Sequence, residues 1–192
     1  MPSSRLGFLI SAALACGLQT LAPAALAQTT TPENTTAGTG KSGAISAEDR
    51  SFVMRAATGG MAEVQLGELA QRNGASSTVK QFGAQMVRDH GQANDELKRL
   101  ASTKGVQLST QLDPEHRALS ERLQKLSGAE FDRAYIQAMR DAHVKDVSLF
   151  EQQAQAGRDS DLKAFAQKTL PTLRQHLQHV QGLAGPANAA SR

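Results

Sequence analysis

Histidine stands on the apolar face of two stretches of this sequence that otherwise follow a helical pattern. The stretches are QMVRDHGQANDEL at residues 85–97 and AMRDAHVKDVSLF at residues 138–150, and each has a methionine four residues before its histidine. Residues three and four apart share one face of a helix, so His90 and His143 fall on faces that a folded chain would bury. Each buried imidazole then needs a partner, because burying an unpaired polar group is costly.

The first and the last helical segments of the chain also have one polar residue on their apolar face. This residue is Glu63 in the first segment and His176 in the last. Counted from the connecting turns, the four groups lie near the middle of their helices. A mismatch of three residues between them is only about 5 Å along a helix. We therefore expect all four to meet in one layer, either as a hydrogen-bond network that fixes helix register or as a metal site.

The metal interpretation rests on the donor set. Three imidazoles and one carboxylate suit a four-coordinate site for one transition metal ion, with zinc, copper and iron as the options. The predicted ligands are Glu63, His90, His143 and His176. Nearby thioethers would favour Cu(I) if they replaced the carboxylate, although methionine is also ordinary core filler; they belong to Met61, Met86 and Met139. Asp89, at the edge of its stripe, is placed to hold a neighbouring histidine ring.

Capping signals divide the chain into four long helices and one short helix. Ser46, and then Ser76 or Ser77, precede the first two long helices, which end near residues 72 and 104. Asp113, followed by a proline, begins the short helix, which runs to about residue 126.

The remaining signals define the last two long helices. Ser127 with Glu130 has the spacing of a capping box, and this helix ends near residue 156. Asp159 or Ser160 starts the last helix, which runs to residue 183 with a kink expected at Pro171.

Four helices of about 25 residues, each about 40 Å long, predict an all-α four-helix bundle. Short links make the first pair and the last pair antiparallel hairpins. The connection between the second and third long helices holds the short extra helix. This connection either crosses the length of the bundle, as in ferritin-like folds, or packs across one end.

The N-terminal residues are typical of export. Residues 1–27 carry one arginine, a short apolar run and the small residues of a cleavage site, which together predict a signal peptide and a periplasmic protein. An alternative, lipoprotein anchoring at Cys16, is disfavoured because the later cleavage site is better formed. Residues 28–44, rich in Thr, Gly and Ser, predict a disordered linker. The domain then covers residues 45–184, followed by a disordered tail at 185–192.

Composition excludes several classes of function. Loss of the signal peptide would lower the formal charge of +3 by one, and no basic patch interleaved with aromatic residues predicts nucleic-acid binding. No apolar run approaches the length of a transmembrane helix. Neither a nucleophile elbow nor a glycine-rich phosphate loop is present. The sequence does not identify a protein partner in the envelope.

Four blocks of the sequence together resemble DUF4142, a family of exported bacterial proteins of unknown function. They are FVMRAATGGMAEVQLGELA at 52–70, VKQFGAQMVRDH at 79–90, FDRAYIQAMRDAHVKDVSLFE at 131–151 and LKAFAQKTLPTLRQHL at 162–177. The resemblance implies a ferritin-like bundle in the bacterial envelope and no established activity. The two-metal pattern of ferritin-like proteins has a glutamate three residues before a histidine on two helices. Val87 and Leu173 stand there instead, which argues against two-iron chemistry.

The resulting interpretation is an exported module of the envelope with a structural or binding role, for which the stress response is one option. Its buried layer is either a hydrogen-bond network or a site for one transition metal ion. Catalysis is not required by any of these features. The alternative is a metal-dependent redox or hydrolytic enzyme that uses the same layer. A coordination position open to solvent would favour the enzyme, and a dry, closed layer would favour the module.

Overall fold

A computed structural model describes residues 45–184 of the chain. This part contains five helices: α1 (Ala47–Asn73), α2 (Ser77–Thr103), α3 (Pro114–Gln124), α4 (Gly128–Ala156) and α5 (Ser160–Leu183). The predicted all-α bundle of four long helices and one short helix is confirmed. The expected signal peptide, linker, tail and Cys16 lie outside the described residues. None of the helices in the described part has an apolar stretch long enough to span a bilayer.

Polar side chains begin four of these helices as predicted. Ser46, Ser76, Asp113 and Asp159 each accept a hydrogen bond from a backbone N–H in the first turn that follows. The capping box predicted for α4 is wrong, because Ser127 forms no side-chain cap hydrogen bond. Gly128 follows it with a φ of 62°, so the backbone leaves helical geometry where a capping side chain would have to reach.

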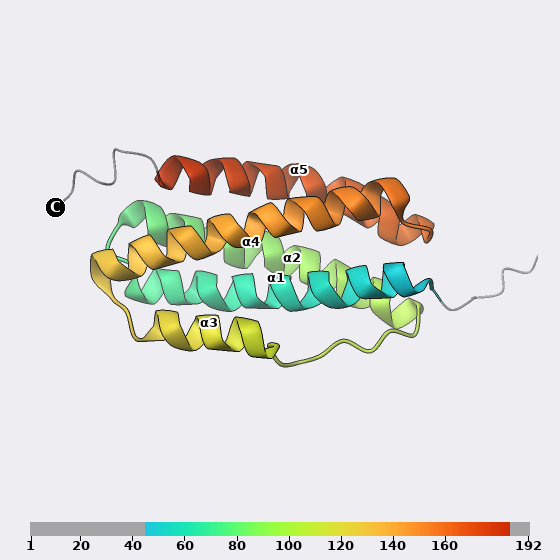
Figure 1. The fold of residues 1–192 in the computed structure, drawn as a ribbon, viewed down its shortest axis with the longest axis horizontal. Coiled ribbons are helices and arrows are strands. Elements are labelled where there is room, and N and C mark those ends of the chain that lie inside the picture. Colours follow the sequence, from blue (N-terminus) through green and yellow to red (C-terminus); the bar gives the residue numbers. More distant parts are fainter. Residues whose placement is uncertain (1–44, 185–192) are drawn as a thin grey trace, which may run out of the picture. The chain divides into compact units, whose positions relative to one another are not determined.

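The two hairpins, α1–α2 and α4–α5, lie side by side, and the connection between them crosses the length of the bundle (Figure 1). Hydrogen bonds join the first turn of α1 to the last turn of α4, where the Gln153 Nε2 donates to Asp49 Oδ1 at 2.7 Å. At the same end Lys104, just after α2, contacts Asp159 at 2.7 Å. Thus α4 runs antiparallel to α1 and parallel to α2. This is the ferritin-like alternative, and α3 lies within the crossing connection against α1 and α4.

The apolar core is divided into two clusters by a polar layer. One cluster contains Phe52, Leu97, Phe150 and Phe165, from the end where α1 begins. The other contains Leu66, Phe82, Tyr135 and Val180, from the opposite end. On every long helix the residue between the two clusters is one of the four polar residues singled out by the sequence: Glu63, His90, His143 and His176. The apolar clusters above and below therefore seal this layer from both ends of the bundle.

Two glycines let α1 and α2 pack closely. A Cβ atom on Gly67 would lie 2.6 Å from the carbonyl oxygen of Gly83, and a Cβ on Gly83 would lie 2.6 Å from the carbonyl oxygen of Gly67. Real Cβ atoms do not approach a backbone oxygen so closely, so both positions need glycine. This contact fixes the height of α2 against α1 and with it the height of His90 against Glu63.

Candidate metal centre

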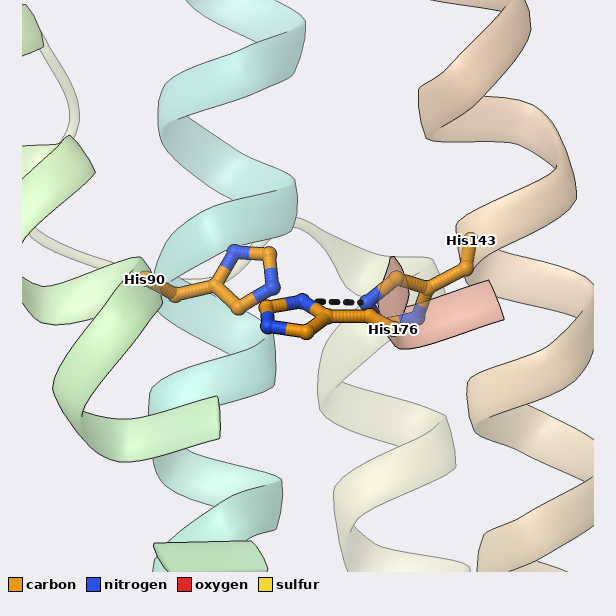
Figure 2. Close-up of side chains that lie close together, drawn as sticks. All are labelled: His90, His143 and His176. Atoms are coloured by element: carbon orange, nitrogen blue, oxygen red, sulfur yellow. Dashed lines mark hydrogen bonds between the residues drawn. The ribbon is translucent and has the colours of Figure 1, made fainter. Parts of the chain in front are cut away.

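The polar layer is buried at the middle of the bundle. The exposed fractions are 3% for Glu63, 6% for His90, 0% for His143 and 1% for His176. The predicted convergence of these four residues from four helices is therefore present. One ring nitrogen from each of the three histidines lies within 4.8 Å of those of the other two. Figure 2 shows the three imidazoles, each projecting from its own helix into the same space.

Each histidine uses one ring nitrogen to bond a fixed oxygen on the outside of the cluster. His90 Nδ1 lies 2.8 Å from Glu63 Oε2. His143 Nδ1 lies 2.9 Å from the carbonyl oxygen of Met139, one turn earlier on the same helix. His176 Nε2 lies 2.8 Å from Asp89 Oδ2. An ionised carboxylate or a carbonyl oxygen only accepts hydrogen bonds, so each of these nitrogens carries the proton of its ring when Glu63 and Asp89 are ionised.

The second nitrogen of each neutral ring is then left with a lone pair. His90 Nε2 is buried and has no hydrogen-bond partner among the described residues. His143 Nε2 and His176 Nδ1 lie 3.3 Å apart (Figure 2). If both rings are neutral, no proton lies between these two nitrogens, because each ring has already placed its proton on the outer side. Something that accepts lone pairs, a proton or a metal ion, has to bridge them.

The electrostatic environment keeps the three rings neutral. Burial lowers the pKa of His90 to about 4, although Asp146 and Asp89 oppose the shift. Burial likewise lowers the pKa of His176 to about 4 despite its hydrogen bond to Asp89. Burial also lowers the pKa of His143, against the attraction of Glu63. At neutral pH the cluster therefore presents unprotonated imidazoles, which is the form that binds metals.

Glu63 holds the ring of His90 and lies near the ring of His143. Its Oε2 binds His90 Nδ1, and its Oε1 lies 3.4 Å from His143 Nδ1. Glu63 therefore has the position of a partner that orients metal-binding histidines from outside. It also belongs to a second group of possible ligand atoms, which it forms with His143 and Asp146 within 4.8 Å.

Asp146 is the residue of this site that sequence reasoning missed. It follows His143 by three residues on α4, and this spacing places the two side chains next to each other on one face of the helix. The spacing from His143 is the feature of the sequence that could have identified Asp146. Its Oδ2 is buried without a hydrogen-bond partner that meets ordinary geometry among the described residues. Burial, and then the neighbouring carboxylate of Glu63, raise the pKa of Asp146 well above its usual value. Burial also raises the pKa of Glu63, with His143 opposing.

Other candidates from the sequence have ordinary roles. Asp89 does hold a histidine ring, as expected, and the ring belongs to His176 on another helix. Met86 and Met139 are fully buried among apolar side chains of one core cluster, which is the position of core filler. His116 bonds the carboxylate of Asp113 at 2.8 Å at the start of α3.

Two cavities adjoin the polar layer. A cavity of about 840 Å³ lies between α1, α3 and α4, and its lining includes Glu63 and Asp146. A void of about 20 Å³ inside the bundle is lined by these same two carboxyl groups and by His90. Such a void has room for a single water molecule. Glu63 and Asp146 therefore stand between the large cavity and the histidines.

The donor set fits one metal ion better than the two-iron centre of many ferritin-like proteins. Two ligands of a tetrahedral zinc ion, each about 2.05 Å from the metal, are about 3.3 Å apart, which is the distance between His143 Nε2 and His176 Nδ1. The two-iron pattern needs four carboxylates around the metals. Val87 and Leu173 occupy two of those positions here, so the residues present do not fit that centre.

Comparison with known proteins places the chain in a family. The family model described as a domain of unknown function, DUF4142, matches residues 34–183. Among curated proteins no sequence matches the chain.

Two solved structures have the same fold. One is a DUF305 fragment from Deinococcus radiodurans, 14% identical, with a TM-score of 0.64, covering 72% of this chain and 96% of that one. The other is a DUF305 protein from Streptomyces coelicolor, provisionally described as secreted, 11% identical, with a TM-score of 0.61, covering 71% of this chain and 91% of that one. At such identities the likeness concerns the fold alone.

Proposed function

This chain belongs to the DUF4142 family of domains of unknown function, and we propose that it is an exported metal-binding module of the bacterial envelope. His90, His143 and His176 hold one transition metal ion at the centre of the bundle. Glu63 and Asp89 orient two of the rings from outside. The export signal predicted at residues 1–27 supports the periplasmic location, as does the description of the Streptomyces coelicolor structure.

The observation that carries the proposal is the position of the three rings. One nitrogen of each ring lies within hydrogen-bond distance of an oxygen on the outer side of the cluster. With the ring protons on these outer nitrogens, three lone pairs face the space between the two apolar core clusters. Metal-binding histidines use this arrangement almost always, with the second nitrogen bonded to a carboxylate or a carbonyl. A plain hydrogen-bond network would instead point donors at acceptors, and His90 Nε2 has no such partner among the described residues.

The ligand chemistry narrows the choice of metal. Neutral imidazoles suit zinc, copper and iron, whereas calcium and magnesium prefer oxygen donors. Glu63, the carboxyl group of the layer, supplies negative charge that partly balances a divalent ion. Zinc, copper or iron therefore fits the site, with water or Glu63 available as a further ligand.

Burial favours a binding module over an enzyme. The three histidines are at most 6% exposed, so a substrate larger than water has no direct path to an ion that they hold. The competing function, metal-dependent hydrolytic or redox catalysis, is favoured by one feature, the cavity of about 840 Å³ that reaches Glu63 and Asp146.

Elemental analysis of protein purified from the periplasm tests the proposal. We expect near-stoichiometric zinc, copper or iron in the wild type and its loss in a His90→Ala, His143→Ala double variant. A His116→Ala, His179→Ala variant changes the same number of histidines outside the layer and should keep the metal. Circular dichroism of each variant separates loss of the site from loss of the fold. The proposal is wrong if the folded wild type takes up none of these metals, even after incubation with an excess of each.

A further inference from the structure

The histidine cluster has two polar sides, one at Asp89, whose side chain is 28% exposed and holds His176, and one at Glu63 and Asp146. Apolar core clusters close both ends. Towards α1 and α4, by contrast, Glu63 and Asp146 separate His90 from the cavity beneath α3. A metal ion that reaches the histidines without unfolding the bundle must pass a place where the wall is thin and polar. Among the described residues, the wall of Glu63 and Asp146 is the polar one that adjoins a large cavity.

The large cavity connects this wall to the surface. Its floor contains the buried residues Ala62, Glu63 and Leu66. Its rim contains exposed side chains, among them Glu115 and Ala118 from α3. A volume of about 840 Å³ is within the usual range of sites that admit small ligands, so a hydrated metal ion can enter it.

In the lining of the cavity, the carboxyl group of Asp146 lies against that of Glu63 and interacts with it. Asp146 Oδ2 is buried and forms no hydrogen bond of ordinary geometry among the described residues. Asp146 and Glu63 each offer an oxygen, and His143 a nitrogen, within 4.8 Å of one another. Buried carboxylate oxygens are normally hydrogen-bonded or bound to a cation, and two neighbouring carboxyl groups that share a proton can exchange that proton for a cation.

We propose that Glu63 and Asp146 form an access site for the metal ion, which binds these carboxyl groups from the cavity beneath α3 and then passes to the three histidines. The inference rests on the proposed function, since it concerns the path to the same metal. Glu63 and Asp146 both line the cavity and the inner void, so an ion that they bind from the cavity lies next to His90, and Asp146 takes part only in transit. Oxygen ligands exchange quickly and bind transition metals less tightly than imidazoles do, so the ion moves on to the nitrogens.

The test separates the rate of metal transfer from the affinity of the final site. Cobalt(II) is added to metal-free protein in a stopped-flow instrument, and its release to EDTA is followed afterwards. In an Asp146→Asn variant we expect uptake and release to slow together by about tenfold, which corresponds to about 1.4 kcal/mol on each barrier, with the Kd little changed. Asp141→Asn, which removes an exposed carboxylate from the rim of the cavity, is the matched control and should leave both rates as they are.

A second pair of variants tests the cavity itself. Ala118 lies at the exposed rim, and a tryptophan there would narrow the mouth of the cavity. Ala118→Trp should therefore slow uptake and release, while Glu121→Trp, on an exposed position of α3 outside the cavity lining, should not.

The possible results point to different errors. If cobalt, zinc, copper and iron all fail to bind the wild type, the proposed function is wrong and this inference falls with it. If the wild type binds metal but Asp146→Asn leaves both rates unchanged, only the access site is wrong. A variant with a weaker Kd and an unchanged rate of uptake also overturns the inference, because Asp146 would then be a permanent ligand.

Discussion

Replacing Asp146 by asparagine should make the metal-free protein more stable at neutral and alkaline pH. The Asp146 carboxyl group lies within 4.8 Å of the Glu63 carboxyl group. Glu63 is buried, and the half-buried Asp146 has its Oδ2 atom buried. Burial and the charge of Glu63 raise the pKa of Asp146 well above its usual value, so the folded state binds a proton that the unfolded state releases. Stability then falls as pH rises from about 4 through this raised pKa, and asparagine removes that loss.

The size of the effect follows from the separation of the two charges. Two unit charges 4.8 Å apart repel by about 3.5 kcal/mol at an effective dielectric constant of about 20. Protonation of one group relieves part of this repulsion, so we expect a gain of about 1–3 kcal/mol at pH 8. The gain should approach zero near pH 4, where the unfolded carboxyl group also holds its proton. For a domain of this size the midpoint of thermal unfolding should rise by about 2–4 °C per kcal/mol.

Urea denaturation in the presence of EDTA, repeated at several pH values from 4 to 8, measures the gain. Asp141→Asn removes an exposed carboxylate one turn earlier and should change stability by no more than about 0.5 kcal/mol. In a Glu63→Gln background the effect of Asp146→Asn should become smaller, because the neighbouring charge is absent, while the part that comes from burial remains. An Asp146→Asn protein that is less stable than the wild type across this pH range would refute the reasoning, since it would show that the carboxylate is stabilised by a partner.

Three further predictions concern helix packing, the end of the bundle and the pH range of metal binding. Gly83→Ala should destabilise the fold by about 1–3 kcal/mol, because the new Cβ atom would meet the backbone of α1. In the control Gly91→Ala the new Cβ atom meets no other atom, so this variant should be more stable by up to about 1 kcal/mol. Equal effects of the two substitutions in urea denaturation would contradict the close contact. Burial acts to raise the pKa of Asp49, but hydrogen bonds from Gln153, Ser46 and the backbone outweigh it and lower the pKa. The contribution of Asp49 to stability is therefore present above about pH 4 and is lost as pH falls through the lowered pKa. Asp49→Ala should lower the free energy of unfolding by about 2–3 kcal/mol at pH 7. An unchanged free energy of unfolding would mean that water replaces the carboxylate. Because burial lowers the pKa of His90 and of His176 to about 4, zinc affinity measured by calorimetry should fall steeply only below about pH 5; a midpoint near the ordinary histidine pKa of 6.5 would show that the rings are hydrated in solution.

The sequence was sufficient to predict the helices, their pairing and the residues that meet at the centre of the bundle. Apolar residues at three and four residue steps define the buried face of each helix, and capping residues define its start. A polar residue on such a face is assigned to a height along the bundle with an error of about one turn. His90, His143 and His176 lie so close together in the structure because the short hairpin turns left little freedom in that height.

The chemical roles of these residues depended on contacts between helices. The direction of α4 depended on a connection that could have crossed the bundle or folded over one end. The lone pair that each histidine turns inward depends on which oxygen holds its other nitrogen, and for His176 that oxygen belongs to Asp89 on α2. The position of Asp146 in the site and the cavity beneath α3 both depend on how α1, α3 and α4 pack together. Periodicity specifies which face of a helix is buried, but the orientation of a ring and the shape of a cavity are set by partners distant in the sequence, which only the tertiary structure brings together.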